Sequence, residues 1–217
     1  MFNAMPVGYW RFDDRSGTVL TDRSAHHNDG TYLGGVTLGI LPSALGSTEL
    51  DPAASFDGVN DSGRVPDSPS LHVGSSFSVE GWIKRSSTTK ANELFNKGAN
   101  GLQLDVMSAA NGNQVWLRRA GVTTIARSAG GVPADGAYHH VVATMDGPGT
   151  AKIYIDGHLD TVAVSPANVI SDTTFPLTFG GAGSTQADYD EFALYDQVLT
   201  PAEVLEHFDA ARGILPP

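Results

Sequence analysis

The sequence predicts an all-β protein with two packed antiparallel sheets and one short C-terminal helix. Short segments of alternating apolar residues recur along the chain, and glycine-containing turn signals separate them. The 217 residues include 25 Gly and 12 Pro but only 17% charged residues, which is typical of many short strands joined by turns. No amphipathic segment of helical length interrupts this series. The strands are therefore expected to pair with one another in a single domain, residues 1–217.

The first part of the chain is expected to contain one clear strand and several irregular segments. Residues 8–12, GYWRF, predict a strand because two large aromatic residues are separated by the period of two. Residues 34–51 mix Gly, Pro, Ser and Leu without a clear period, which indicates an irregular or edge segment. Residues 53–56 and the Asp57-Gly58 pair favour a strand that ends in a hairpin turn, and we prefer this to a ligand-binding role for the pair.

Residues 77–85, FSVEGWIKR, predict a long strand in the middle of the chain. Apolar residues fall on one face, and the opposite face is mixed. Trp82 on the mixed face is expected to pack under a loop or a neighbouring sheet, and the alternative is a stacking platform for a sugar ring. Trp116 and Tyr138 are further candidates for such a platform, but packing explains each of them better.

Three residue pairs that favour tight hairpin turns punctuate the second half of the chain: Asn111-Gly112, Asp146-Gly147 and Asp156-Gly157. Alternating apolar segments flank these pairs, which predicts antiparallel strand pairs. The strand at residues 139–145 begins with two adjacent histidines, His139 and His140. Adjacent residues of a strand point to opposite faces, so a regular strand does not allow both to ligate one ion.

The C-terminal helix has the most complete local signal in the chain. Thr200 is the expected N-cap, Pro201 occupies the first helical position and Glu203 completes a capping box. Leu199 and Val204 occupy the two positions of a hydrophobic staple. The apolar face is too short to form a stable helix alone, so it must dock on the strands. This face is expected to consist of Val204, Leu205 and Phe208.

The charge balance excludes several classes of function. The net charge is −11, from 13 Lys and Arg against 24 Asp and Glu, and no basic cluster offsets it, so nucleic acid is not an expected partner. There is no cysteine, which excludes disulfides and thiolate metal sites. No segment is long enough for membrane insertion, and the first residues lack the features of a signal peptide. We therefore expect either a cytoplasmically made protein or a domain of a longer secreted chain.

A polar loop at residues 13–34 follows the first strand. It admits two interpretations: a solvated loop held by Asx and Gly turns, or a calcium loop. The spacing is not that of an EF-hand, so turn chemistry is the simpler interpretation of the loop by itself. The residues concerned are Asp22, Ser24, Asn28, Asp29 and Gly30.

Eight segments in this order carry a resemblance to a known family: YWRF, D-x-S-x-x-x-N-D-G, FDG, FSVEGWIK, YHHVVATMDG, KIYIDG, LTFGG and YDEFALYDQVLTPAEV. They resemble the laminin-G-like, concanavalin-A-like jelly-roll family over residues 7–212. The resemblance implies a sandwich of two curved antiparallel sheets with a short helix near the sheet edge. Most members are non-catalytic binding modules for glycans, proteins or other surfaces, and many carry a calcium ion.

The resemblance also implies a structural calcium ion (Ca2+) shared by the polar loop and the acidic pair that opens the last strand. The implied ligands are Asp22, Asn28, Asp190 and Glu191, with backbone carbonyls near residues 28–31. If the first and last strands are antiparallel neighbours, the two acidic patches meet. Such carboxylates repel one another unless a cation or protons neutralise them. The alternative is a solvated acidic pair beside a loop held by Asx turns.

The leading functional hypothesis is a non-catalytic adhesion or binding module that recognises a glycan or a partner protein, on an extracellular or virion surface. No catalytic triad, phosphate-binding loop or Cys/His metal cluster supports an enzyme, although related jelly rolls include glycan-active enzymes. A structural alternative is a bacteriophage virion component. Such a capsid decoration or tail-associated protein would assemble through its jelly roll, as a homo-oligomer or with other virion partners.

Overall fold

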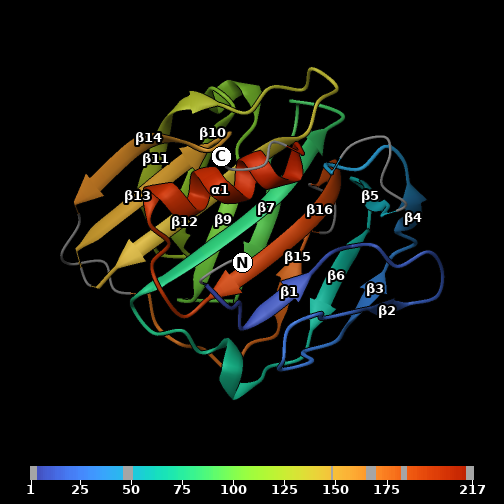
Figure 1. Ribbon diagram of the computed structural model, residues 1–217, viewed down its shortest axis with the longest axis horizontal. Coiled ribbons are helices and arrows are strands. Elements are labelled where there is room, and N and C mark those ends of the chain that lie inside the picture. The colour runs from blue at the N-terminus through green and yellow to red at the C-terminus, as the bar shows by residue number, and fades with distance from the viewer. Residues whose placement is uncertain (1–3, 46–50, 148, 165–169, 182–184, 214–217) are drawn as a thin grey trace.

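The structure is a computed structural model that describes residues 4–45, 51–147, 149–164, 170–181 and 185–213 (Figure 1). Part of the segment predicted to be irregular, residues 34–51, lies outside these ranges. The elements are β1 (Gly8–Trp10), β2 (Val19–Leu20), β3 (Gly30–Leu33), β4 (Thr37–Ile40), β5 (Ala53–Asp57), β6 (Ser62–Val65), η1 (Pro69–Leu71), β7 (Phe77–Arg85), β8 (Asn92–Asn96), β9 (Leu102–Val106), η2 (Ala109–Asn111), β10 (Gln114–Arg119), β11 (Thr123–Gly131), β12 (His139–Asp146), β13 (Thr150–Ile155), β14 (His158–Val164), β15 (Leu177–Phe179), β16 (Gln186–Tyr195) and α1 (Pro201–Ala211).

Within the described ranges the strands form two antiparallel eight-stranded sheets. Sheet A has the order β14-β13-β12-β7-β16-β5-β4, with β1 also paired to β16. Sheet B has the order β11-β10-β9-β8-β15-β6-β3-β2. The sheets pack face to face, and apolar side chains from both inner faces form one continuous core. The predicted all-β fold, a two-sheet antiparallel jelly-roll sandwich with one C-terminal helix, is confirmed.

The core is built around a cluster of aromatic rings. The ring centroid of Phe12 lies 5.3 Å from that of Phe179 in sheet B and 5.5 Å from that of Phe192 in sheet A. Trp10 packs 5.0 Å from Phe179, and its indole nitrogen donates to the carbonyl of Asn28 at 3.0 Å. The aromatic rings of this cluster are fully buried, so the first predicted strand joins the two sheets to each other.

β1 and β16 are antiparallel neighbours, which meets the condition under which the polar loop and the acidic pair lie close together. Tyr9 of β1 lies opposite Ala193 of β16. The backbone amide of Glu191 donates to the carbonyl of Arg11 at 3.3 Å. This pairing places the start of the polar loop beside the acidic pair of β16.

α1 begins with the predicted capping box. The Thr200 side chain accepts a hydrogen bond from the Glu203 amide, and the Glu203 carboxylate accepts one from the Thr200 amide at 2.7 Å. Leu199 and Val204 are buried in the same cluster, which confirms the hydrophobic staple. The sequence around residue 200 therefore fixes the start of the helix by itself.

α1 lies across the outer face of sheet A (Figure 1). Val204, Phe208 and Ala211 are buried beneath it, because residues at i, i+4 and i+7 lie on one stripe of a helix. The prediction that Leu205 belongs to this face is wrong. Leu205 is 41% exposed, since it lies about 100° around the helix axis from Val204. No helix in the described part of the chain is long and apolar enough to cross a lipid bilayer.

The predicted hairpins are confirmed in the second half of the chain but not in the first. Asp156 and Gly157 have φ values of 51° and 77°, as a tight turn between the paired strands β13 and β14 requires. Asp146-Gly147 connects the antiparallel neighbours β12 and β13. Asn111-Gly112 also lies between antiparallel neighbours, β9 and β10, but at the end of η2 in a longer connection and not in a tight turn. Asp57-Gly58 does not, because β5 belongs to sheet A and β6 to sheet B. The turn signal there is real, but the chain crosses between the sheets at this point.

Candidate functional site

The prediction of a single polar loop at residues 13–34 is wrong, because this range contains the paired strands β2 and β3. The polar loop that remains between them, residues 21–29, is held by hydrogen bonds to its own carboxylates. Asp22 is 1% exposed and accepts from the backbone amides of Tyr9 and Ser24, both at 2.8 Å. It also accepts from the Asn28 amide at 2.7 Å and from the Ser24 hydroxyl at 2.8 Å. The Asn28 side chain donates to the carbonyl of Val7 at 3.0 Å. Asp22 and Asn28 therefore lie together, and donors already occupy both oxygens of the carboxylate.

Asp190 and Glu191 lie at a β-bulge in β16. The register against β7 shifts after Asp190, and Glu191 has a φ of 53°. The Glu191 carboxylate accepts from Arg11 Nε at 2.8 Å and from the Tyr9 hydroxyl. Asp190 Oδ2 accepts from the Ala44 amide at 2.8 Å instead. Burial raises the pKa of Asp190 to about 8, and the charge of Glu191 adds to this effect.

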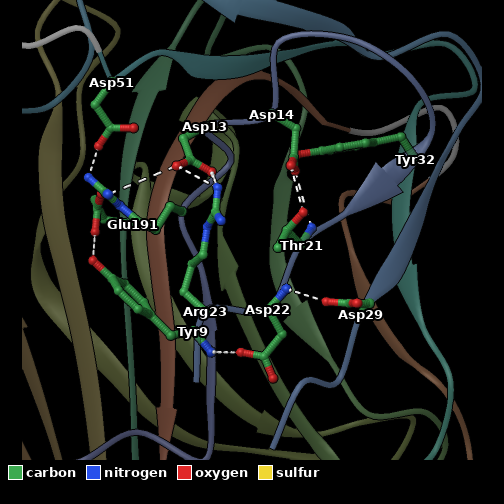
Figure 2. Close-up of polar contacts among 11 residues, drawn as sticks. Tyr9, Asp13, Asp14, Thr21, Asp22, Arg23, Asp29, Tyr32, Asp51 and Glu191 are labelled. Atoms are coloured by element: carbon green, nitrogen blue, oxygen red, sulfur yellow. Dashed lines mark hydrogen bonds and ion pairs between the residues drawn. The ribbon is translucent and has the colours of Figure 1, made fainter. Parts of the chain in front are cut away.

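Neighbouring acidic residues are also paired with donors, as Figure 2 shows. Asp14 accepts from the hydroxyls of Thr21 and Tyr32 at 2.7 and 3.0 Å. Arg23 Nη2 donates to both oxygens of Asp13 at 3.0 Å. Each of these carboxylates thus has a donor within the protein itself.

The four implied calcium ligands do not form one set in this arrangement. Asp22 lies with Asn28, and Tyr9 contacts both Asp22 and Glu191. Asp190 faces a different segment. Among the described residues, no group of three or more His, Cys, Asp or Glu side chains is placed to hold a metal ion. A calcium ion would have to displace the donors on Asp22 and Glu191, although Asp190 Oδ1 is buried without a hydrogen-bond partner. Calcium binding stays a prediction from the family resemblance.

Two of the three aromatic residues considered as sugar platforms are packed against other groups. Trp82 is 5% exposed and packs against both His140 and Phe208, whose ring centroids are 4.9 and 5.6 Å from its own. Tyr138 is partly buried, and the ammonium of Lys84 lies 4.9 Å from the centroid of its ring. Packing therefore explains both residues, although Trp82 packs under α1, whereas a loop or a neighbouring sheet was predicted.

Trp116, the third candidate, lies in a row of polar side chains on the outer face of sheet B. The register places Arg127, Trp116, Asp105 and Glu93 opposite one another on β11, β10, β9 and β8. The guanidinium of Arg127 lies 4.2 Å from the centroid of the Trp116 ring, and that of Arg118 lies 5.9 Å away. The indole is therefore flanked by two cations on a partly exposed face.

A second row runs beside the first and crosses six strands. Its members follow one another in the register: Arg118, Gln103, Asn96, Thr178, Arg64 and Thr31. Neighbouring strands lie about 4.8 Å apart, so this row is roughly 24 Å long. Its side chains range from partly buried to exposed. We call the two rows together the sheet B platform.

Hydrogen bonds join the two rows of the sheet B platform. Gln103 Nε2 donates to Asp105 at 3.1 Å, and Asn96 Nδ2 donates to Glu93 at 2.9 Å. Arg118 forms an ion pair with Asp105 at 3.3 Å. Burial raises the pKa of Asp105 to about 6, with the charge of Glu93 adding to it, and burial also raises the pKa of Glu93. The platform thus holds donors and acceptors at fixed positions.

Sequence reasoning did not identify the sheet B platform. The period of two within β9 and β10 already places Gln103 and Asp105 on one face, and Trp116 and Arg118 on another. This alternation within the strands could have identified half of the sheet B platform from the sequence. The other half depends on β8 pairing with β15 and β15 with β6, which are neighbours in the sheet but distant in the chain.

A family model described as the concanavalin A-like lectin/glucanase superfamily matches residues 57–205. The chain belongs to this superfamily. The matched range contains most of the two sheets and reaches into the capping box of α1. No curated protein sequence matches the chain.

Several solved structures are similar in fold to this two-sheet sandwich. The binding domain of Paraclostridial mosquitocidal protein 1 is 17% identical, with a TM-score of 0.74 over 95% of this chain and 52% of that one. Domain 4 of AbnA, a GH43 extracellular arabinanase from Geobacillus stearothermophilus in complex with arabinotriose, is 21% identical, with a TM-score of 0.71 over 94% and 98% of the two chains.

A botulinum neurotoxin domain is a third similar structure. The binding domain of botulinum neurotoxin DC in complex with SialylT is 16% identical, with a TM-score of 0.71 over 98% of this chain and 53% of that one. This chain therefore spans about half the length of the two toxin binding domains and nearly all of the arabinanase domain. At these identities the likeness establishes the fold.

Proposed function

We propose that this protein is a non-catalytic carbohydrate-binding module that holds a glycan chain on the sheet B platform. The observation that carries the proposal is the pair of polar rows around Trp116, which are fixed by the sheet register and cross four and six strands. A row of roughly 24 Å suits an extended chain of several sugar rings better than a single small molecule.

The chemistry of the sheet B platform matches that of a sugar. A glycan presents hydroxyls that donate and accept, together with apolar ring faces. The Glu93 carboxylate accepts, and the Arg118 guanidinium and the Gln103 and Asn96 amides donate. Asp105 is only 4% exposed and holds Arg118 and Gln103 in position. The indole of Trp116 adds a flat apolar surface, and the positions of the polar groups provide specificity.

The two carboxyl groups of the sheet B platform are assigned to binding rather than hydrolysis. Glu93 and Asp105 lie opposite each other on neighbouring strands, and the Gln103 amide donates to both, at 3.5 and 3.1 Å. Thr178 also donates to Glu93 at 3.3 Å. Since protein donors hold both carboxyls, we expect no release of reducing ends from a bound polysaccharide.

The comparisons support a sugar-binding role outside the cell. The arabinanase domain, which this chain matches over nearly its full length, was solved with arabinotriose, and one toxin binding domain was solved with SialylT. We propose an extracellular or virion surface as the place where the module works, and arabinan-type and sialylated glycans as the first ligands to test.

Affinity electrophoresis and calorimetry against a panel of plant polysaccharides and sialylated oligosaccharides test the proposal. We expect binding by the native protein and a loss of at least tenfold in affinity for Trp116→Ala, because aromatic anchors carry a large share of such contacts. Glu93→Gln should weaken binding less, since it keeps the shape of the side chain.

The matched control is Val122→Ala at the tip of the β10–β11 hairpin. Val122 is 55% exposed and lies outside both polar rows, so its removal should change neither binding nor the melting temperature. Retention of full glycan affinity by Trp116→Ala, or the absence of any hit in the panel, would exclude the sheet B platform as a glycan site.

A second candidate function is assembly, and the edge strand β14 is the observation that favours it. β14 ends sheet A, and it exposes Leu159, Val162 and Val164 by 49%, 52% and 74%. An exposed apolar edge strand is a template for pairing with another chain. Light scattering should then show an oligomer that Val162→Lys dissociates, whereas a monomeric native protein would remove this candidate.

A further inference from the structure

The sheet B platform carries more cations than carboxyl groups, in contrast to the chain as a whole. Its two rows contain Arg64, Arg118 and Arg127 against Glu93 and Asp105. The whole chain has a net charge of −11, so the arginines are concentrated on a face of an otherwise acidic protein. A local excess of positive charge attracts anionic ligands.

Arg127 lies at the β11 end of the platform. Its guanidinium stacks on the Trp116 ring, 4.2 Å from the ring centroid. A stacked guanidinium keeps its N–H groups in its own plane, where they can donate to a carboxylate beside the ring. Arg118 also lies near this indole, but it is balanced by Asp105 at 3.3 Å. Arg127 is therefore the cation of this end that a ligand can pair with.

Arg64 lies on β6, towards the other end of the second row. It is exposed, and its neighbours in the register are Thr178 of β15 and Thr31 of β3, neither of which carries a charge. Among the residues that the structure describes, no carboxylate forms an ion pair with Arg64 or Arg127. Both guanidinium groups thus keep their donors for an acidic ligand.

The two unpaired arginines are far apart. Five strand spacings separate β11 from β6, which is roughly 24 Å. Between them the second row presents Gln103, Asn96 and Thr178, whose amides and hydroxyl suit the hydroxyls of a sugar. One ligand can reach both arginines only if it is a chain of several sugar units with acidic groups along it.

The two carboxyl groups of the platform do not cancel its cationic ends. Asp105 is 4% exposed and is neutralised by Arg118. The Glu93 carboxylate accepts from Asn96 Nδ2 at 2.9 Å and from the Thr178 hydroxyl at 3.3 Å. Burial raises the pKa of both carboxyl groups, which disfavours their charged forms. Repulsion of an acidic chain is therefore confined to the middle of the first row.

We propose that the sheet B platform selects an acidic polysaccharide, whose carboxylate-bearing sugar units pair with Arg127 at one end and with Arg64 at the other. This inference rests on the function proposed above, because it names the class of glycan for the same platform. Arginine binds a carboxylate through two parallel N–H bonds, which a neutral sugar does not accept in the same geometry.

Calorimetric titration of the intact protein with polygalacturonate and with hyaluronan tests the proposal. Each polysaccharide is compared with its methyl-esterified form, which keeps the sugar rings and linkages but lacks the charge. We expect the acidic form to bind roughly tenfold more tightly, as two exposed ion pairs allow, and this preference should fall as salt is added. Digalacturonate is too short to reach both arginines, so it should bind more weakly than longer oligomers.

Charge-removing variants locate the acidic groups. Arg64→Gln and Arg127→Gln should each weaken binding of the acidic form by about fivefold and leave the esterified form nearly unchanged. Lys152→Gln is the matched control, because it removes the same charge from the outer face of sheet A. Its neighbours Ala151 and Ile153 belong to the core, so Lys152 points away from the sheet B platform. The control should bind the acidic form normally.

The outcomes separate this inference from glycan binding itself. Equal affinity for the acidic and esterified forms, or full affinity in both arginine variants, would overturn the acidic class and leave a glycan site on the platform intact. Equal weakening by Lys152→Gln and Arg64→Gln would show a general effect of net charge and overturn the assigned arginines. Absence of binding to every polysaccharide, acidic or neutral, would overturn the proposed function as well.

Discussion

Glu80→Gln is the substitution that most directly tests how α1 is fastened to sheet A. The buried carboxylate forms an ion pair with His207 of the helix, with Glu80 Oε1 3.0 Å from His207 Nδ1. It also accepts from Tyr195 and His140. An amide has almost the same volume, but it carries no charge and turns an NH2 group towards one of these donors. The substitution therefore removes the ion pair without creating a cavity.

The expected loss of stability follows from this burial. Removing one partner of a buried ion pair costs about 3–5 kcal/mol, and we expect the lower end because the amide oxygen can still accept from one donor. In a chain of this length, 1 kcal/mol corresponds to a change of about 2–4 °C in melting temperature. Glu80→Gln should therefore melt roughly 6–12 °C below the native protein.

The effect should depend on pH in a defined direction. Burial lowers the pKa of His207, but the bond to Glu80 outweighs this and raises the pKa above 6.5. The stabilisation from His207 is thus fully present below about pH 6.5 and is lost as the pH rises through the raised pKa. Burial raises the pKa of Glu80, but the bonds from His140 and His207 hold it well below 4.5, so its contribution is lost only in strong acid. The difference between native protein and variant should shrink in alkaline solution.

Scanning calorimetry from about pH 5 to pH 9 measures this difference. Asp146→Asn is the matched control, because it makes the same carboxylate-to-amide change at an exposed position on β12. It should shift the melting temperature by no more than a degree or two, as expected for a surface change within about 0.5 kcal/mol. Equal melting of Glu80→Gln and native protein at pH 6, or a difference that grows towards pH 9, would refute the reasoning.

Three further predictions address other parts of the chain. Arg85→Met should lower the free energy of unfolding by about 3 kcal/mol, because the guanidinium donates to the carbonyls of Lys90, Met107 and Val132. Each buried acceptor left unpaired costs at least roughly 1 kcal/mol. A loss below about 1 kcal/mol in urea unfolding would contradict this prediction. Thr200→Ala should lower the free energy of unfolding by about 1 kcal/mol in the same assay, because it removes the N-cap of α1. Thr200→Ser should lose much less stability, since serine also caps a helix, and equal losses for the two variants would show that the cap is unimportant. Calcium added to chelator-treated protein should raise the melting temperature if the predicted ion binds, whereas an unchanged value leaves the polar loop supported by hydrogen bonds alone.

Features encoded in short windows could be predicted from the sequence. The capping box at Thr200 and Glu203 needs only residues one turn apart, so the helix begins where the sequence says. The Asp156-Gly157 turn requires positive φ at both positions, which these residue types tolerate better than most. The two faces of β7 follow from the pleat.

The candidate sites could not be predicted, because they depend on contacts between distant segments. The acidic pair of β16 lies in a bulge, which turns Glu191 to Arg11 and Tyr9 and leaves Asp190 facing Ala44. No local pattern marks that extra residue. The same limit applies to the turn after β5, where the residue types predict a turn but not the sheet that the next strand joins.

The sequence by itself determined long strands such as β7 and β12, the hairpins of the second half and the capped helix, because backbone geometry and side-chain period act over a few residues. It did not show the short strands β2 and β3, which lie in the range predicted to be a loop. The tertiary structure alone decided which strands are neighbours. That choice aligns Trp116 with Asp105 and Glu93 across sheet B, and it brings His207 of α1 onto Glu80 of β7. Burial in these contacts then sets the pKa values of the carboxyls, since the cost of a buried charge depends on partners that lie far away in the chain.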